Sequence, residues 1–328
     1  MLVESVPNVS EGRRLDVVER LADAVTSVPG VFLLDRTSDP SHNRTVFTVA
    51  GEHDAVTEGL ERLVECAVVD IDMEEHRGEH PRIGAVDVIP FIPLGDTTMD
   101  DCVALAREFG ARIADRNEIP VYLYAAAATR ADRVRLADVR RGQYEGLKVE
   151  IVQNGRQPDL GPARMHPRFG AVAVGARPFL IAWNINLDSA DVELAKRISR
   201  RVRESGGGLP RVQANGFRVE EPERGRPVLA QVSMNLLDFG TTPLWSAWDA
   251  VAELAAEDGV ELLESELIGL APVAAFLDVA DHAGCPSDAD TATRLRAAAA
   301  AIRLRDFSPL MALELRLAAA RETGRDRG

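Results

Sequence analysis

The sequence is poor in cysteine and has no long hydrophobic run. Its three cysteines, Cys66, Cys102 and Cys285, are far apart and lack the close Cys and His spacing of metal sites. This pattern argues against disulfide bonds and favours a reducing compartment. The first residues lack the basic and apolar segments of a secretory signal, and no run is long enough to span a bilayer. We therefore expect a cytoplasmic protein without a membrane partner.

Lysine is also scarce, and negative charge dominates the 328-residue chain, whose formal net charge is -14 at pH 7. Nonspecific binding of nucleic acid needs a basic surface that displaces phosphate counterions, so we expect no nucleic-acid partner. Lysine occurs only at Lys148 and Lys196, and the other positive side chains are arginines, whose planar guanidinium matches carboxylates. A biased codon composition explains the excess of arginine equally well.

Common nucleotide-binding and hydrolase motifs are missing. The chain has no GxGxxG fingerprint, no GxxxxGK[ST] phosphate loop and no GxSxG elbow. A metal site at His76 and His80 is disfavoured, because Gly78 and Pro81 break the helix that would align them and no third ligand is evident. We expect no metal.

Hydrophobic periodicity predicts two units with the same order of elements. The first has strands near residues 2–7, 31–35, 45–50 and 85–93, with helices after Ser10, the expected cap, and from about Asp54. A helix at 99–115 and a strand at 121–125 extend it. The second has strands at 179–186, 212–219, 228–236 and 260–267, with helices at 190–204 and 244–256. Both read βαββαβ.

We therefore expect an α+β protein with two ferredoxin-like βαββαβ subdomains, residues 1–177 and 178–328, whose sheets face a central cleft. Residues from about 291 onward are rich in Ala, Arg and Leu. They predict a helical tail suited to packing or to a dimer surface.

One short segment occurs twice. Residues 80–86 recur almost letter for letter as residues 166–172, and each copy leads into an apolar run that ends in Pro-Phe. The first copy is expected before the fourth strand of the first unit, and the second before the first strand of the second unit. Because these places differ, we interpret the similarity as shared turn chemistry, and the two histidines need not share a role.

Polar residues of three segments are candidates for a site. Histidine titrates near neutrality, so His80 can act as a general base and then as a general acid, with Glu79 and His76 as candidate neighbours. Asn8 and the pair Asn43-Arg44 lie at strand ends, where an arginine can fix a carboxylate, although a capped turn beside a solvated arginine fits as well. The turn-rich segment 158–166 fits a loop around a flat ligand or an interdomain connection equally well.

Seven motifs together resemble the glutamate formiminotransferase family. They follow the family order along nearly the whole chain, at residues 6–12, 43–45, 76–93, 121–124, 182–187, 230–236 and 269–272. The resemblance extends to the stand-alone transferase and equally to the transferase half of formiminotransferase-cyclodeaminase.

This resemblance implies transfer of the formimino group from N-formimino-L-glutamate to tetrahydrofolate, the co-substrate, with release of L-glutamate in histidine degradation. It also implies a tunnel between two ferredoxin-like subdomains, and a homodimer. By motif match His80 is the catalytic histidine, which takes a proton from folate N5 and delivers it to the departing amine. The residues implied to contact folate are Gly161, Pro162, Ala163, Arg164, Met165, His166, Pro167, Arg168, Phe169, Gly170 and Gly208.

Both implied substrates carry glutamate carboxylates, so arginines are the expected anchors in an otherwise acidic protein. The residues assigned to substrate binding are Asn8, Asp35, Asn43, Arg44, Glu79, Arg82 and Arg177. Two alternatives stay open: folate-dependent formyl transfer from N-formylglutamate, and a noncatalytic folate-binding protein on the same scaffold. The complete segment 78–82 argues against a pure binder, which has no need of a proton shuttle.

Overall fold

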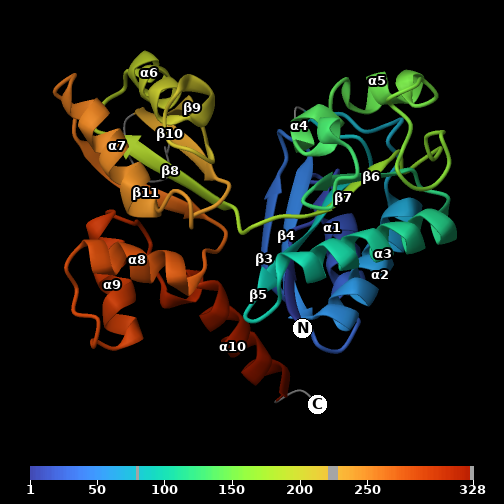
Figure 1. Cartoon of the computed structure of the whole chain (residues 1–328), viewed down its shortest axis with the longest axis horizontal. Coiled ribbons are helices and arrows are strands. Elements are labelled where there is room, and N and C mark those ends of the chain that lie inside the picture. Colours follow the sequence, from blue (N-terminus) through green and yellow to red (C-terminus); the bar gives the residue numbers. More distant parts are fainter. Residues whose placement is uncertain (79–80, 221–227, 326–328) are drawn as a thin grey trace. The chain divides into compact units, whose positions relative to one another are not determined.

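The structure is a computed structural model that describes residues 1–78, 81–220 and 228–325 (Figure 1). The chain divides into two compact units, Met1–Pro178 and Phe179–Gly328. The described residues form two β-sheets and ten α-helices, so the expected α+β class is confirmed.

The first unit contains a seven-stranded sheet. Its strands lie in the spatial order β3 (Val31–Asp39), β4 (Arg44–Glu52), β1 (Leu2–Ser5) with β2 (Asn8–Val9), β5 (Val86–Leu94), β7 (Val172–Ala176) and β6 (Val121–Ala125). β1 and β2 both pair antiparallel with β4 and β5, and Pro7, which has no N–H to donate, lies at the break between them. β7 lies between β5 and β6 and is parallel to both.

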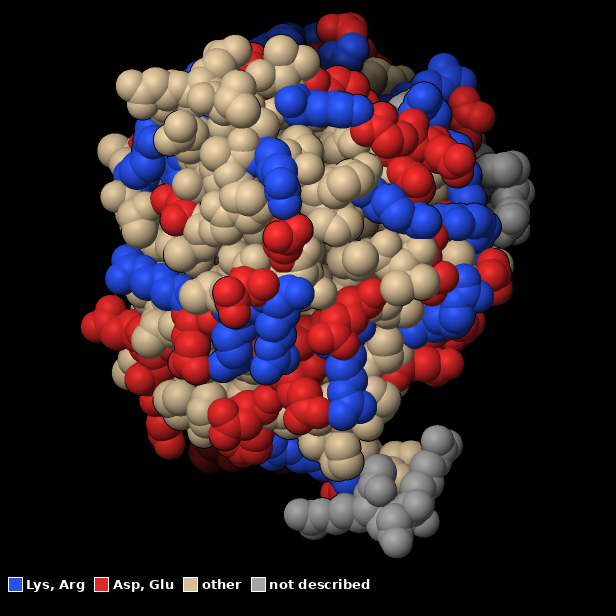
Figure 2. Space-filling view, turned by 90° about the vertical axis from the view of Figure 1, so that its right-hand side faces the viewer, with Lys and Arg blue, Asp and Glu red and all other residues tan. Residues whose placement is uncertain are grey.

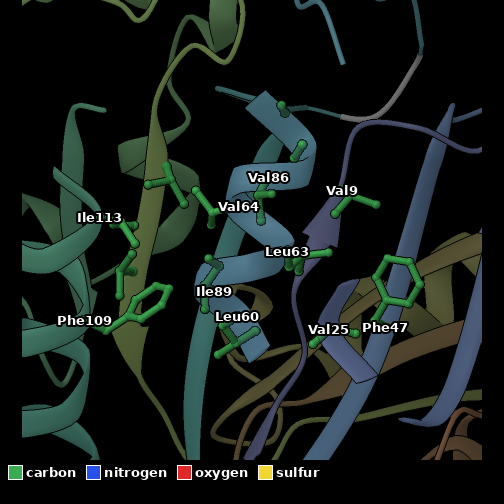
Figure 3. Close-up of a cluster of buried hydrophobic side chains, with 14 of the residues drawn as sticks. Val9, Val25, Phe47, Leu60, Leu63, Val64, Val86, Ile89, Phe109 and Ile113 are labelled. Atoms are coloured by element: carbon green, nitrogen blue, oxygen red, sulfur yellow. The ribbon is translucent and has the colours of Figure 1, made fainter. Parts of the chain in front are cut away.

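Three helices cover one face of this sheet, namely α1 (Leu15–Thr26), α2 (His53–Asp70) and α3 (Met99–Asn117). Figure 3 shows the core between the layers, where Phe47 and Ile89 from the strands lie among Leu60, Leu63 and Phe109 from the helices. All five side chains are fully buried. Each contributes about 1.5–3 kcal/mol of hydrophobic stabilisation, which holds the strands that carry the polar residues described below.

Side chains of alternate strand residues point to the second face of the sheet. The short helices α4 (Leu136–Val139) and α5 (Gln143–Glu150) pack there against β6 and β7. Val139 and Leu147 contact a cluster that includes Tyr122 and Tyr124. The β4 residues Arg44 and Thr48 belong to the same face, because Phe47 and Val49 point into the opposite core.

The second unit contains a four-stranded antiparallel sheet in the order β11-β8-β10-β9. Its elements follow the chain as β8 (Ile181–Leu187), α6 (Val192–Val202), β9 (Val212–Val219), β10 (Leu229–Leu236), α7 (Leu244–Ala256) and β11 (Leu262–Ile268). A separate hydrophobic core forms around Trp183, Ile185 and Val232. Three further helices follow, α8 (Val273–His282), α9 (Thr291–Ala301) and α10 (Leu313–Arg325).

The expected place of the second copy of the repeated segment was wrong. The second copy of the repeated segment precedes β7 in the sheet of the first unit, not the first strand of the second unit. Gly84 and Gly170, the fifth residues of the two copies, form an antiparallel bridge with each other. Local periodicity does not reveal such an insertion, because β7 pairs with strands that are distant in the sequence.

Ser10 does not cap α1. Its hydroxyl donates to the Gly84 carbonyl at 2.8 Å, and the carboxylate of Glu11 accepts the N–H groups of Gly12, Arg13 and Arg14, which precede the helix. The expected loop 37–43 is also shorter than predicted, because β3 continues to Asp39. Helices α4, α5 and α8 were not predicted.

Candidate active site

Three motif segments meet at one end of the first sheet, and Asn43 connects them. Its side-chain oxygen accepts the N–H of Gly12 at 3.0 Å, and its amide nitrogen donates to the carbonyl of Arg77 at 3.1 Å. Its own carbonyl accepts a hydrogen bond from Nε2 of His76 at 3.0 Å. Asn43 has a φ of 49°, in the left-handed region that asparagine tolerates better than most residues. The expected substrate residue Asn43 thus joins the loops.

Gly78 closes this junction. A Cβ atom there would collide with the carbonyl oxygen of His42 and lie 2.9 Å from the Cβ of Asn43, so only glycine fits without a shift. Glu79 and His80, the expected substrate-binding and catalytic residues, follow directly in the sequence and lie outside the described residues. Their assigned roles stay predictions.

A buried network anchors the chain on both sides of these two residues. His76 and Arg82 are 6% and 5% exposed. Nε of Arg82 donates to Nδ1 of His76 at 3.2 Å, so the proton of the neutral imidazole is on Nε2, which donates to Asn43. Burial lowers the pKa of His76, and the charge of Arg82 adds to this effect, while the bond to Asn43 opposes it.

The same network holds the guanidinium of Arg82. Its two terminal nitrogens donate to the carboxylate of Glu145 at 2.7 and 3.0 Å, and one of them also donates to Gln143 at 3.1 Å. Arg82, an expected substrate anchor, is therefore bound by protein partners. Its contact with a substrate stays a prediction.

Other expected substrate residues gather on the second face of the sheet. Asn8 lies on β2 between Val46 of β4 and Val88 of β5, and Asp35 of β3 pairs with Thr48 of β4. Arg44, the first residue of β4, is half-buried, and its Nε has no hydrogen-bond partner among the described residues. The sheet thus brings Asn8, Asp35 and Arg44 to one surface.

The surroundings of Arg44 lower the pKa of its guanidinium group. Burial lowers its pKa, and the guanidinium of Arg140 lowers it further, while the carboxylates of Asp39 and Asp87 act in the opposite sense. Asp87 is itself buried, accepts the N–H of Ile83 at 2.8 Å and forms an ion pair with Arg140. Sequence reasoning missed Arg140, because it lies outside every recognised motif.

Arg177, a further expected anchor, follows β7. Its side chain donates to the carbonyl of Pro178 at 3.0 Å, and its positive charge acts on the hydroxyl of Tyr124. Burial raises the pKa of Tyr124, which therefore stays a neutral hydrogen-bonding group near pH 7. Tyr124 was visible in the sequence only as part of the motif at residues 121–124.

The expected folate loop begins and ends at glycines with positive φ, 81° at Gly161 and 83° at Gly170. Nδ1 of His166 accepts the N–H of Phe169 at 3.0 Å, so the neutral ring carries its proton on Nε2, and burial lowers its pKa. At the end of the loop, the N–H of Ala85 donates to the carbonyl of Phe169 at 2.7 Å. The loop therefore ends beside the segment that follows His80.

The remaining residues of the loop have varied surroundings. Arg164 forms an ion pair with Glu118 at 3.0 Å, and Arg168 donates to the carbonyl of Val69 at 2.9 Å. Met165 packs against the buried core. Pro162, Ala163 and Pro167 lie between these contacts. Gly208 belongs to the second unit, in the turn after α6, where its N–H donates to the carbonyl of Arg203 at 3.1 Å.

Three further features of the described residues concern metal binding, membrane-spanning helices and charged surface areas. Within the described ranges, no group of three or more His, Cys, Asp and Glu residues is arranged to hold a metal ion. None of the described helices is long and apolar enough to cross a membrane. On the face shown in Figure 2, basic and acidic side chains are interspersed, and its described residues form no extended basic area.

Comparisons with known proteins agree with the two-unit organisation. The formiminotransferase domain, N-terminal subdomain, matches residues 2–177, and the formiminotransferase domain matches residues 182–306. Glutamate formimidoyltransferase of Streptococcus pyogenes serotype M1 is 42% identical over 86% of this chain and 92% of its own length. The protein of the same name from Thermoplasma acidophilum is 44% identical, over 86% and 91%. Formimidoyltransferase-cyclodeaminase of Rattus norvegicus is 44% identical over 85% of this chain, but over only 52% of its own length.

The fold and these similarities define a group-transferring enzyme. The chain belongs to the formiminotransferase family, so the resemblance inferred from its motifs is confirmed.

Proposed function

We propose that the protein transfers the formimino group of N-formimino-L-glutamate to tetrahydrofolate, giving 5-formiminotetrahydrofolate and L-glutamate in histidine degradation. The observation that carries this proposal is family membership across both units, together with relatives named glutamate formimidoyltransferase over nearly their full length. Tetrahydrofolate acts as a co-substrate, and the reaction needs no metal.

His80 is the proton shuttle in this proposal. Folate N5 attacks the formimino carbon, and a tetrahedral intermediate forms as His80 accepts the N5 proton. The intermediate collapses when His80 gives this proton to the departing glutamate nitrogen. Such general acid–base catalysis contributes about 10²- to 10⁴-fold. The hydrogen bonds of His76 and Arg82, on either side of His80 in the chain, support this role because they fix both ends of its segment.

We assign the remaining residues either to folate binding or to substrate binding. Residues 161–170 and Gly208 contact folate, and Asn8, Asp35, Asn43, Arg44, Glu79, Arg82 and Arg177 bind or orient the substrates. The half-buried guanidinium of Arg44, with its unpaired Nε, supports an anion site on this sheet face.

The architecture belongs to the proposal as well. Residues 1–177 form the N-terminal subdomain with the catalytic histidine and folate loop, and residues 178–328 form the C-terminal subdomain. The antiparallel order β11-β8-β10-β9, with two helices in the connections, supports a ferredoxin-like subdomain, and β3, β4, β1 and β5 repeat it in the first unit. We propose that the two sheets face a cleft or tunnel in a cytoplasmic homodimer.

Replacement of His80 tests the mechanism. We expect His80→Ala to lower kcat by about 10²-fold or more while the circular dichroism spectrum and Tm are retained. The matched control is His282→Gln on the second unit, whose ring bonds to Asp249 at 3.1 Å, far in sequence from the motif; it should keep normal turnover. Near-normal turnover in His80→Ala excludes the shuttle.

The donor is tested with purified protein, tetrahydrofolate and either formiminoglutamate or formylglutamate, by following folate absorbance. We expect product only with formiminoglutamate. Product from formylglutamate alone assigns the formyl alternative, and tight folate binding without turnover of either donor assigns a binding protein.

A further inference from the structure

Arg44 and Arg140 come from different elements of the first unit, but their guanidinium groups are close enough to repel each other. Arg44 begins β4, and Arg140 is the residue that follows α4. Val9 of β2 pairs with Thr45 on one side and Val86 on the other, which brings Arg44 and Asp87 to the same end of the sheet. Asp87 forms an ion pair with Arg140.

Two arginines and two carboxylates form this group, and both carboxylates already have other hydrogen-bond partners. Asp87 acts on the charge of Arg44, and its two oxygens already accept from Ile83 and Arg140. Asp39, which also acts on Arg44, accepts the N–H groups of Ser41 and His42 and contacts the His42 ring. Neither carboxylate forms a hydrogen bond with Arg44.

Both arginines contain a buried donor without a partner. Within the described part of the chain, Nε of Arg44 and Nε of Arg140 are inaccessible to solvent and make no hydrogen bond. An unsatisfied buried donor costs about 1–3 kcal/mol, and more for a charged group. Because these Nε atoms are buried, an anion would accept from the outer nitrogens of the two guanidinium groups, and its charge would offset the repulsion between them.

We infer that Arg44 and Arg140 together bind one carboxylate of a glutamyl group, with Asp87 orienting Arg140. This inference rests on the proposed function, which supplies glutamyl carboxylates from two sources, the formimino donor and the tail of tetrahydrofolate. A planar carboxylate with two oxygens fits two guanidinium groups, each of which offers parallel N–H donors. Arg140 is thereby a substrate-binding residue of this chain.

Equilibrium binding to the intact protein provides the test. L-glutamate and tetrahydrofolate monoglutamate are titrated separately by calorimetry into the wild-type protein and into Arg44→Gln and Arg140→Gln. We expect both variants to bind one of the two ligands about 10- to 100-fold more weakly, the loss expected for a charge-assisted contact. The ligand whose affinity falls identifies the source of the carboxylate.

Two controls separate binding from folding. Arg141→Gln replaces the adjacent exposed arginine and should leave both affinities unchanged. Arg44→Gln breaks no hydrogen bond of the described structure, so its Tm should equal or exceed the wild-type value, whereas Arg140→Gln leaves Asp87 without its ion pair and should lower it.

Unchanged affinity for both ligands in Arg44→Gln and Arg140→Gln overturns the inference, as does wild-type protein that binds neither ligand. Because calorimetry does not require turnover, the two proposals fail separately. Wild-type protein that binds glutamate through Arg44 and Arg140 but does not turn over formiminoglutamate contradicts only the proposed function.

Discussion

His76 shows how a histidine next to a catalytic segment serves a structural purpose. Both ring nitrogens are used, one by Asn43 and one by Arg82, and the side chain is buried. The neutral ring satisfies this arrangement, whereas a protonated ring would direct a second N–H at the guanidinium of Arg82. The segment before His80 therefore depends on an uncharged imidazole.

This dependence predicts a pH effect on stability. The pKa of His76 is lowered in the folded protein, so its contribution to the free energy of unfolding is complete above the unfolded pKa of about 6.5 and is lost as the pH falls toward the folded value. Denaturant unfolding should thus show declining stability from about pH 7.5 to 5.5, in a range above the usual titration of carboxylates.

His76→Gln should reduce the slope of this decline. His166, whose pKa burial also lowers, contributes in the same direction, so part of the slope should remain until His166→Gln is added. A slope that is unchanged in the double variant contradicts the assignment.

Some residues of the candidate site could be predicted from the sequence, and others could not. Asn43, Arg44 and Arg82 were recognisable because they belong to dense polar motifs. Glu145, Gln143 and Arg140 come from a segment without a predicted element, and only the folded chain brings them to Arg82 and Asp87.

Among the elements, α1 has an unusual beginning. Its capping position is Arg14, which supplies no side-chain acceptor. The carboxylate of Glu11 accepts the N–H groups of Gly12, Arg13 and Arg14 at 2.9–3.0 Å and also binds the side chain of Arg14. Burial raises the pKa of Glu11, but these hydrogen bonds have the larger combined effect and hold the pKa below its usual range. Glu11 therefore holds residues 12–14, the turn that leads into α1.

Removing this carboxylate should destabilise the protein. We expect Glu11→Ala to lower the free energy of unfolding by about 1–3 kcal/mol, because three backbone N–H groups lose a charged acceptor. The matched control Glu65→Ala, on the exposed side of α2, should change it by less than about 0.5 kcal/mol. Equal effects of the two substitutions in urea denaturation count against this role of Glu11.

Elements with strong periodicity were predictable, and those defined by distant pairing were not. The expected strand at 212–219 and helix at 244–256 have the bounds of β9 and α7. The second copy of the repeated segment was misplaced because β7, the strand that follows it, pairs with β5 and β6, which are far away in the sequence. The short helices α4 and α5 have too few turns for a clear apolar stripe.

At the scale of the whole molecule, each unit has its own hydrophobic core. The cluster around Phe47 and Leu60 contains only residues of the first unit, and the cluster around Trp183 and Val232 contains only residues of the second. A unit with a separate core has the main requirement for independent folding.

We therefore expect fragments 1–178 and 179–328, expressed separately, to retain helical circular dichroism and to unfold cooperatively. Neither fragment should catalyse transfer, since the proposed site uses residues of both, including Gly208 of the second unit. A fragment that shows the spectrum of an unfolded chain would falsify the independence of its core.

The most direct test of the proposed transfer is the stoichiometry of glutamate release. Purified protein is mixed with formiminoglutamate and tetrahydrofolate, and free L-glutamate and the folate product are quantified together. We predict one L-glutamate for each tetrahydrofolate consumed, and loss of both signals in His80→Ala. Absence of glutamate release by folded wild-type protein with both substrates present would contradict the proposed function.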